Sequence, residues 1–422
     1  MASAVAPSLQ PLAELPRVDS VSATPMISYP SIEAKFETDK YLLREAMLVM
    51  RKDNHECLPR GYPNTIRTPA VWTSDTLDVE EITHRASQTD VRELENAVHS
   101  FKASKLGLNE LSPGTFPLPN LGYKLREVSK TIHEGRGAAI IKGLCPSDYT
   151  MEDNIIMFAG LSSYVGDQRG RQSALGDVLT HLYSTRDKSI QDPRPGLSTH
   201  GLPFHNDHCD ILALYVMETA VKGGKTRWAS GGQIYNEMAR TKPQAIKVLA
   251  EGDWPHETPT KAVKYLPLMF QNPDEAPFLS FTRFALTGLP TYPRGPDSPE
   301  LSPEQADALD TLQYLAEKHA VEIEQEKGDI LLLNNRDVLH ARDRIEDSPD
   351  TSQRHLLRLC LRDTEYGRPI PEDLKRRWGD IFDNDQNEHG KWVIDKDHDS
   401  SFVSSSKFDA LFTNDETTGS HG

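Results

Sequence analysis

Hydrophobic residues recur at intervals of three and four in several stretches of the chain, and this spacing is typical of amphipathic helices. The clearest stretch covers residues 118–133, after which a Gly-Arg-Gly segment ends the pattern. The last predicted helix has a good start, because Ser302 can cap its first turn. Together, the pattern predicts helices over residues 118–133, 151–165, 236–249 and 303–319.

Short apolar runs between turn residues predict buried strands over residues 138–141, 211–219 and 330–333. A longer strand is predicted from Arg354 to Arg362, and successive side chains of a strand point to opposite faces. One face of this strand would carry Arg354, Leu356, Arg358, Cys360 and Arg362, and the other would carry His355, Leu357, Leu359 and Leu361. The mixture of strands and helices indicates a barrel or sandwich of strands wrapped by helices.

Arg354 and Arg358 give the strongest single clue to a binding site. A buried guanidinium group needs an anionic partner. If their face of the strand is exposed to solvent, the leucine-rich face forms the core and the arginines need no further explanation. If their face points into a barrel, they require an anion, and a dicarboxylate would bind them in bidentate geometry.

The chain divides into three parts. Residues 1–35 are rich in Pro, Ser and Ala and are expected to form a flexible lead-in. Residues 36–382 are expected to form a single domain, with the chemically informative motifs in about 100–370. Residues 383–422 form a polar tail that either packs as one short helix or stays loose.

Composition narrows the class of protein. The 422 residues carry a formal charge of −16, which argues against nucleic-acid binding, because that depends on clustered Lys and Arg. The sequence contains no apolar stretch of about 20 residues to span a membrane and no secretory signal at its start. Its four cysteines lack CxxC spacing. We therefore expect a cytoplasmic enzyme with free thiols.

His205 and Asp207 are candidate metal ligands. They lie two residues apart, so in an extended segment both side chains point the same way. His208 and Asp210 repeat the same spacing, but Pro203 and Phe204 lead into the first pair, which we prefer. By itself this pattern is a weak signal for a metal.

His340, taken alone, would be a surface histidine in a polar loop. With His205 and Asp207 it completes a set of two imidazoles and one carboxylate, which suits Fe(II) and leaves other coordination positions open. Thr226 follows a Gly223-Gly224 turn and opens a predicted strand. Its hydroxyl could help to bind the same carboxylate as the arginines.

In this order along the chain, the motifs resemble those of the taurine dioxygenase family of Fe(II)- and 2-oxoglutarate-dependent oxygenases. The resemblance covers roughly residues 100–370. It rests on the segments 204–207 and 223–226, on Asn335, Arg336 and His340, and on Arg354 with Arg358. Asn206 departs from the family pattern, which more often has Thr there, and residues 346–352 lengthen the segment before Arg354.

The resemblance implies a mixed α+β fold with a double-stranded β-helix core of the jelly-roll, cupin-like type, flanked by helices. His205, Asp207 and His340 would be the iron ligands. Thr226 and Arg354 would hold the distal carboxylate of 2-oxoglutarate, and Arg358 would lie nearer the metal, close to the cosubstrate or an acidic substrate. The cofactors would be Fe(II), 2-oxoglutarate and O2.

The implied reaction oxidises an unactivated C–H bond by hydroxylation, desaturation or cyclisation, and releases succinate and CO2. The partner would be a small molecule, acidic or derived from an amino acid, such as an acidic secondary metabolite. Segments 166–169, 182–183, 266–270 and 281–284 are candidates for lining its pocket. The sequence leaves the oligomeric state open, a homodimer included.

Two other classes of protein fit part of the pattern. A zinc-dependent hydrolase could use the same three ligands to activate water, but Arg354, Arg358 and Thr226 would then have no role. A non-catalytic jelly-roll binding protein could also contain the site. All the proposed positions hold residues suited to their task, which favours the oxygenase.

Overall fold

A computed structural model describes residues 36–49, 57–173, 176–183, 198–258, 261–273, 275–288, 293–346, 354–382 and 390–395. The expected lead-in over residues 1–35 lies outside the described residues, as does the expected tail except for residues 390–395. None of the helices in these ranges combines the length and apolar character that crossing a lipid bilayer requires.

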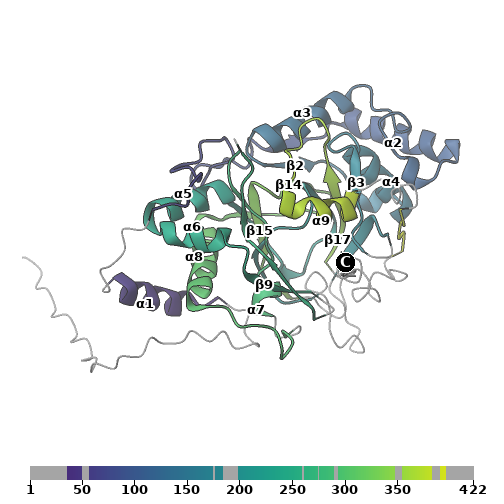
Figure 1. Ribbon diagram of the computed structural model, residues 1–422. Helices are drawn as coiled ribbons and strands as arrows, with labels where there is room; N and C mark the ends of the chain where they lie inside the picture. Colours follow the sequence, from purple (N-terminus) through teal and green to yellow (C-terminus); the bar gives the residue numbers. More distant parts are fainter. Residues whose placement is uncertain are drawn as a thin grey trace, which may run out of the picture.

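Two β-sheets form the centre of the molecule (Figure 1). The larger has seven strands in the order β1-β2-β14-β6-β17-β3, with β4 also paired to β17. They are β1 (Thr83–Arg85), β2 (Ala138–Lys142), β3 (Gln168–Gly170), β4 (Leu179–Tyr183), β6 (Ile211–Glu218), β14 (Ile330–Asn334) and β17 (His355–Arg362). The smaller sheet has four antiparallel strands in the order β13-β8-β15-β5. They are β5 (Leu202–His205), β8 (Thr226–Ser230), β13 (Val321–Ile323) and β15 (Val338–Arg342).

Three two-stranded ribbons complete the described strands. They pair β7 (Lys222–Gly223) with β16 (Ile345–Glu346), β9 (Trp254–Glu257) with β10 (Val263–Leu266), and β11 (Met269–Phe270) with β12 (Phe278–Leu279). The described α-helices are α1 (Thr38–Val49), α2 (Gln88–Ser104), α3 (Leu121–Glu134), α4 (Met151–Ser162), α5 (Gly231–Thr241), α6 (Pro243–Ala250), α7 (Phe284–Thr287), α8 (Pro303–His319) and α9 (Glu372–Phe382).

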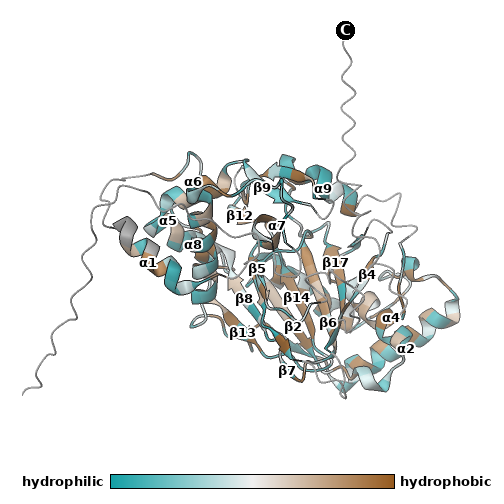
Figure 2. Cartoon of the chain, turned by 90° about the horizontal axis from the view of Figure 1, so that it is seen from below, coloured by the Kyte–Doolittle hydropathy of each residue, from teal (hydrophilic) through white to brown (hydrophobic). Residues whose placement is uncertain are grey.

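The hydrophobic residues form three layers. One cluster lies between the sheets and contains Trp228 of β8 together with Leu356 of β17. A second joins the outer face of the larger sheet to α2, α3 and α4, and a third joins the smaller sheet to α5, α6 and α8. Figure 2 shows apolar strands between these two groups of helices. Burial on both faces explains why these strands have continuous apolar runs.

The alternating pattern predicted for β17 is confirmed. Leu357, Leu359 and Leu361 belong to the cluster that packs on the helices, whereas Leu356 and Cys360 belong to the cluster between the sheets. The arginine-bearing face therefore points between the two sheets, and the alternative with that face in solvent is wrong.

The predicted helices and strands agree with the structure with one exception. The single helix predicted over residues 236–249 is wrong, because α5 ends at Thr241 and α6 begins at Pro243. Proline has no N–H to donate and its ring disfavours a helical residue before it. Lys242 accordingly leaves the helical conformation, with φ −153° and ψ 59°.

Asp363 attaches the end of β17 to α3. Its carboxylate is 2% exposed, pairs with Arg126 and accepts a hydrogen bond from Ser129 Oγ at 2.9 Å. It also accepts the backbone N–H groups of Glu365 and Tyr366, each at 2.9 Å. Burial alone would raise its pKa, but the bonds to Arg126, Tyr366 and Ser129 lower it below the ordinary 3.8.

Replacing Asp363 with asparagine is expected to lower the free energy of unfolding at pH 7 by about 1–3 kcal/mol, since buried donors lose their charged acceptor. A depressed folded-state pKa stabilises the protein above the unfolded pKa and ceases to do so as pH falls through the folded value. The difference from wild type should therefore shrink below about pH 4. Urea unfolding at several pH values measures this difference in unfolding free energy, with the exposed Asp75→Asn as the control. A difference that does not change with pH would contradict a lowered pKa of Asp363 in the folded state.

Candidate metal centre

Two strands of the smaller sheet bring His205 and His340 together. His205 ends β5, and His340 lies directly opposite it in the antiparallel β5–β15 pair. The ring centroids are 4.2 Å apart. Trp228 pairs with His340 from the other side, and because Trp228 belongs to the cluster between the sheets, His340 faces the interior. Strand register thus joins two histidines that are far apart in the chain.

Asp207 completes the group. One ligand atom from each of His205, Asp207 and His340 lies within 4.8 Å of the others. Burial alone would raise the pKa of Asp207, but the charge of Arg358 and the adjacent histidines lower it to about 2. The carboxylate is therefore ionised at neutral pH.

Both imidazoles are neutral at neutral pH. Burial lowers the pKa of His205, and burial together with the neighbouring His205 lowers that of His340 to about 3. His205 Nδ1 lies 2.9 Å from the carbonyl oxygen of Pro203 and donates its proton there. The lone pair of the unprotonated Nε2 is therefore available to coordinate a metal. The buried His340 Nδ1 has no hydrogen-bond partner among the described residues. Two neutral imidazoles and one carboxylate fit a divalent transition metal such as Fe(II).

Asn335 supports the segment that carries Asp207, a role that no pattern in the sequence indicates. Its side-chain oxygen lies 3.3 Å from the Asp207 backbone nitrogen, and its Nδ2 donates to the carbonyl oxygen of Cys209 at 3.1 Å. Asn206 in turn donates to the carbonyl oxygen of Asn335 at 2.5 Å. This reciprocal bonding fixes the backbone on both sides of Asp207.

Asp210 of the second His-x-Asp pair has a structural role instead. Asp210 is 5% exposed and lies 3.3 Å from Arg336 Nη2 and 3.6 Å from Arg362 Nε. It also accepts a hydrogen bond from Trp378 Nε1 of α9 at 3.1 Å. Asp210 is therefore engaged with cations and with α9, and the preference for the first pair agrees with this geometry.

The glycine turn sets the position of Thr226. Gly223 has φ +74°, and a Cβ there would lie 2.1 Å from the carbonyl oxygen of Arg344. Thr226 follows at the start of β8, is 4% exposed, and accepts a hydrogen bond from Gln325 Nε2. Its hydroxyl proton remains able to donate to an anion.

Arg354 lies immediately before β17 and is 6% exposed. A Cβ at Gly224 would lie 3.4 Å from its Cδ, so its stem runs along the same glycine turn that leads to Thr226. The structure therefore brings the two predicted carboxylate-binding residues to one region between the sheets.

Arg358 contacts the candidate metal group directly. Its Nη1 lies 3.3 Å from Asp207 Oδ2, and its Nε donates to Gln172 Oε1 at 2.6 Å. Gln172 also donates from Nε2 to the carbonyl oxygen of Arg358 at 2.9 Å. Gln172 thus holds Arg358 at both its backbone and its side chain. No local pattern marks Gln172, since the contact depends on the packing of residues before β4 against β17.

The segments predicted to line a pocket have mainly structural contacts. Both oxygens of Asp167 accept bonds from Thr364, and Arg169 donates to the carbonyl oxygens of Leu111 and Asn109. Phe281 is 1% exposed, and its carbonyl oxygen accepts the Asn206 N–H at 3.0 Å. Segment 281–284 therefore borders the site through its backbone.

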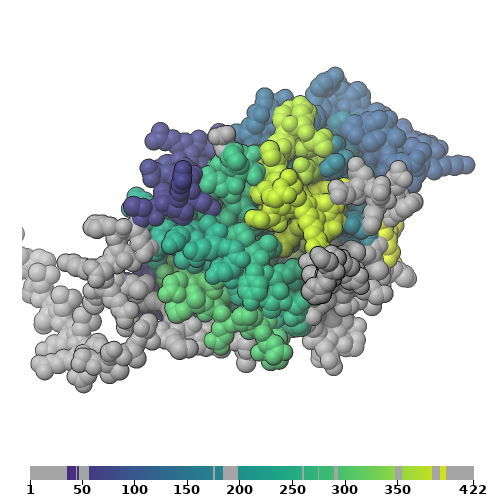
Figure 3. Space-filling view, in the orientation of Figure 1, coloured from purple at the N-terminus to yellow at the C-terminus, as the bar shows by residue number. Residues whose placement is uncertain are grey.

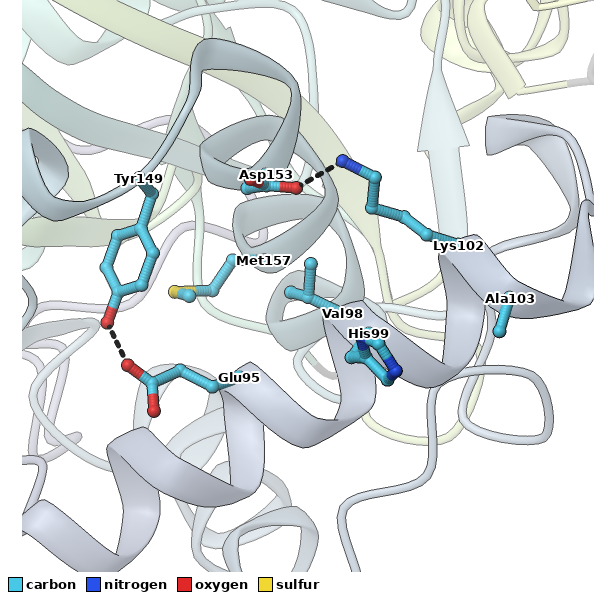
Figure 4. A pocket seen from close by; sticks show the side chains of 8 residues that line it. All are labelled: Glu95, Val98, His99, Lys102, Ala103, Tyr149, Asp153 and Met157. Atoms are coloured by element: carbon cyan, nitrogen blue, oxygen red, sulfur yellow. Dashed lines mark hydrogen bonds and ion pairs between the residues drawn. The ribbon is translucent and has the colours of Figure 1, made fainter.

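A separate pocket of about 390 Å³ lies between α2 and α4 (Figure 4). Four of its polar side chains are bonded in pairs, since Tyr149 donates to Glu95 and Lys102 to Asp153. None of the candidate site residues lines it, so it has no part in the chemistry considered below.

The chain is similar in sequence to known proteins. The family model of taurine catabolism dioxygenase TauD, TfdA family, matches residues 99–360. The chain is 37% identical over 311 residues to the taurine hydroxylase-like protein SAT17 of Stachybotrys chartarum, which covers 72% of this chain and 80% of that protein. It is 24% identical over 323 residues to FR-33289 synthase of Streptomyces rubellomurinus, covering 74% and 94% of the two chains.

Solved structures show the same fold at low identity. An asparagine oxygenase in complex with Fe(II), 2S,3S-3-hydroxyasparagine and succinate superposes with a TM-score of 0.54 at 14% identity, covering 66% of this chain and 93% of the other. The non-heme iron oxygenase OrfP in complex with Fe and alpha-ketoglutaric acid gives 0.51 at 16% identity, with the same coverage. The cupin-like fold expected from the motifs is therefore confirmed at this level.

Proposed function

Because the chain belongs to the taurine catabolism dioxygenase TauD, TfdA family, whose members are Fe(II)- and 2-oxoglutarate-dependent oxygenases, we propose that it hydroxylates a small acidic substrate at an iron held by His205, Asp207 and His340. The observation that carries this proposal is the set of three ligand atoms within 4.8 Å of one another. Nothing in this family membership supports the hydrolase or the non-catalytic alternative.

The residues around the three ligands prepare them for binding. Pro203 fixes the tautomer of His205, and Asn335 holds the backbone at Asp207. Arg358 keeps the Asp207 carboxylate ionised and oriented. When bound, Fe(II) with 2-oxoglutarate and O2 supplies the oxidation that converts a substrate C–H bond to C–OH and yields succinate and CO2.

Thr226 and Arg354 are proposed to hold the distal carboxylate of 2-oxoglutarate. The Thr226 hydroxyl can donate one hydrogen bond, and the Arg354 guanidinium can donate two in a planar fork. Both residues are buried beside the Gly223–Gly224 turn, so their interaction with a carboxylate is shielded from water. The apolar side chains between the sheets exclude water from this region.

We infer that the two sheets form a double-stranded β-helix, within a single domain over residues 36–382. Two features support this inference. The orders β4-β17-β6-β14 and β5-β15-β8-β13 alternate strands from the early and late parts of the chain, and one apolar cluster lies between the two sheets. Hydroxylation is preferred to desaturation or cyclisation because the relative at 37% identity is described as taurine hydroxylase-like.

Anaerobic addition of Fe(II) and 2-oxoglutarate to the protein is expected to produce the weak visible charge-transfer band of an iron–2-oxoglutarate complex. Replacing Arg354 with glutamine should raise the 2-oxoglutarate concentration that gives half of the maximal band intensity by at least about tenfold. The reason is that the carboxylate would lose its hydrogen bonds to a charged group. Exposed Arg344→Gln is the control. Absence of a band in the wild-type protein would refute the proposed function, and an unchanged titration in the Arg354 variant would refute only the role of Arg354.

A further inference from the structure

Residues 390–395, the last described part of the chain, pack beside the start of β4 and form a short segment that we name the C-terminal strap. The Lys391 N–H donates to the carbonyl oxygen of Gly176 at 2.8 Å, and the Val178 N–H donates to the carbonyl oxygen of Lys391 at 3.0 Å. These two bonds form an isolated parallel bridge. Figures 1 and 3 show yellow residues from the end of the described chain beside blue residues from its first half. The strap therefore holds the backbone just before β4.

Side chains also attach the strap to the rest of the domain. Trp392 donates from Nε1 to Asn109 Oδ1 at 2.6 Å, and the Arg169 guanidinium lies 5.6 Å from the centre of the Trp392 ring. Val393 is 5% exposed, and its carbonyl oxygen accepts a hydrogen bond from His181 Nε2 of β4 at 2.8 Å. Contacts with separate parts of the chain thus fix the strap in one position.

Gln172 connects the backbone that the strap holds to the candidate metal centre. Its N–H donates to the carbonyl oxygen of Asp177 at 2.7 Å, and its Nε2 donates to that of Val178 at 2.8 Å. The same Nε2 donates to the Arg358 carbonyl oxygen, and Gln172 Oε1 accepts a bond from Arg358 Nε. Arg358 Nη1 in turn lies 3.3 Å from Asp207 Oδ2. Hydrogen bonds and peptide links therefore form a continuous path from the strap to a proposed iron ligand.

The position of the Gln172 amide depends on the position of Val178. Both protons of Nε2 are used, one on Val178 and one on Arg358, so a shift of either carbonyl oxygen moves the amide. Val178 is 2% exposed, and its N–H is the group that bonds the strap. Without the strap this buried donor would lose its partner, and the backbone would have to shift to reach another.

We propose that the C-terminal strap is a positioning element of the metal centre, which holds Gln172 and thereby fixes Arg358 against Asp207. The inference rests on the proposed function, because it concerns the same iron ligand. Outer partners of metal ligands contribute about 10- to 100-fold to metal affinity or activity. The strap acts one step beyond Gln172, so the loss of its backbone bonds should weaken metal binding by less than the loss of Gln172 itself.

Binding of Fe(II) to the full chain without 2-oxoglutarate, measured anaerobically by calorimetry, tests this inference. Gln172→Ala should raise the Fe(II) dissociation constant by about tenfold or more. Lys391→Pro removes the N–H that bonds Gly176 and should raise it by about threefold to tenfold, within the range for residues that act on a site through a packed network. Lys391→Ala keeps both backbone bonds and should therefore restore most of the wild-type affinity.

Trp392→Ala provides a second variant in case Lys391→Pro fails to fold, and it should weaken Fe(II) binding in the same direction. Tyr149→Ala is its matched control, because both rings are partly buried against the same apolar cluster and Tyr149 bonds Glu95, away from the strap. This control should lower stability to urea but leave the Fe(II) dissociation constant nearly unchanged. A merely structural role of Trp392 would give the same result as the control.

The double variant Gln172→Ala/Lys391→Pro tests whether the strap acts through Gln172. The proline should then add little to the loss caused by Gln172→Ala, because effects within one hydrogen-bond network are not additive. Additive losses would overturn the proposed path, as would an unchanged dissociation constant in Lys391→Pro or, if that variant does not fold, in Trp392→Ala. Each of these results would leave the metal centre intact. Absence of Fe(II) binding by the wild-type protein would instead refute the proposed function, and the role of the strap with it.

Discussion

Replacing Asp207 with alanine is expected to abolish 2-oxoglutarate turnover, measured as succinate formed per iron. The loss should exceed about 100-fold, because even the outer partners of metal ligands contribute 10- to 100-fold to metal affinity or activity. Asp207 supplies the one negative charge of the three-residue group, and its removal leaves Arg358 facing two neutral imidazoles. Alanine at His205 or His340 should have an effect of similar size.

The matched control is His99→Ala, which removes an exposed imidazole on α2 and should leave turnover unchanged. Metal content should be measured on the same samples, because loss of a ligand predicts loss of bound iron together with loss of succinate. Full activity in all three ligand variants would eliminate the metal centre as assigned.

Replacing Asp210 with alanine is expected to lower the free energy of unfolding by about 3–5 kcal/mol, the range for removal of one partner of a buried ion pair. Arg336 and Asp210 are 4% and 5% exposed, so the remaining guanidinium would lose its carboxylate inside the protein. Trp378 would lose its acceptor as well, which should loosen α9.

Urea unfolding followed by tryptophan fluorescence measures this effect, and exposed Asp297→Asn should change stability by less than about 0.5 kcal/mol. A loss below about 1 kcal/mol in the Asp210 variant would show that the carbonyl partners of Arg336 suffice to hold it. In that case Asp210 would have a minor role in the fold.

Much of the centre could be predicted from sequence because it depends on local geometry. The two-residue period of an extended chain is enough to pair His205 with Asp207, and alternation along β17 is enough to separate its arginines from its leucines. The α5–α6 break was missed although Pro243 is visible in the sequence, since the hydrophobic period continues across it. Here the covalent geometry of proline overrode the pattern.

The remaining features depend on contacts between distant parts of the chain. Gln172 reaches Arg358, and Arg377 reaches His208, only because the sheets and α9 pack as they do. Asn335 was part of the motif, yet its bonds to Asp207 and Cys209 follow from the turn between β14 and β15. A single sequence carries no signal for such pairings.

The position of β5 at the margin of its sheet has one further consequence. Among the described strands, β15 alone pairs with it, and the ladder is irregular between His340 and Arg342. An ion bound by both His205 and His340 would link this edge strand to β15. Part of the free energy of ion binding would then stabilise the pairing of β5 with β15 against local unfolding. Metal binding and the pairing of this edge strand would therefore be thermodynamically coupled.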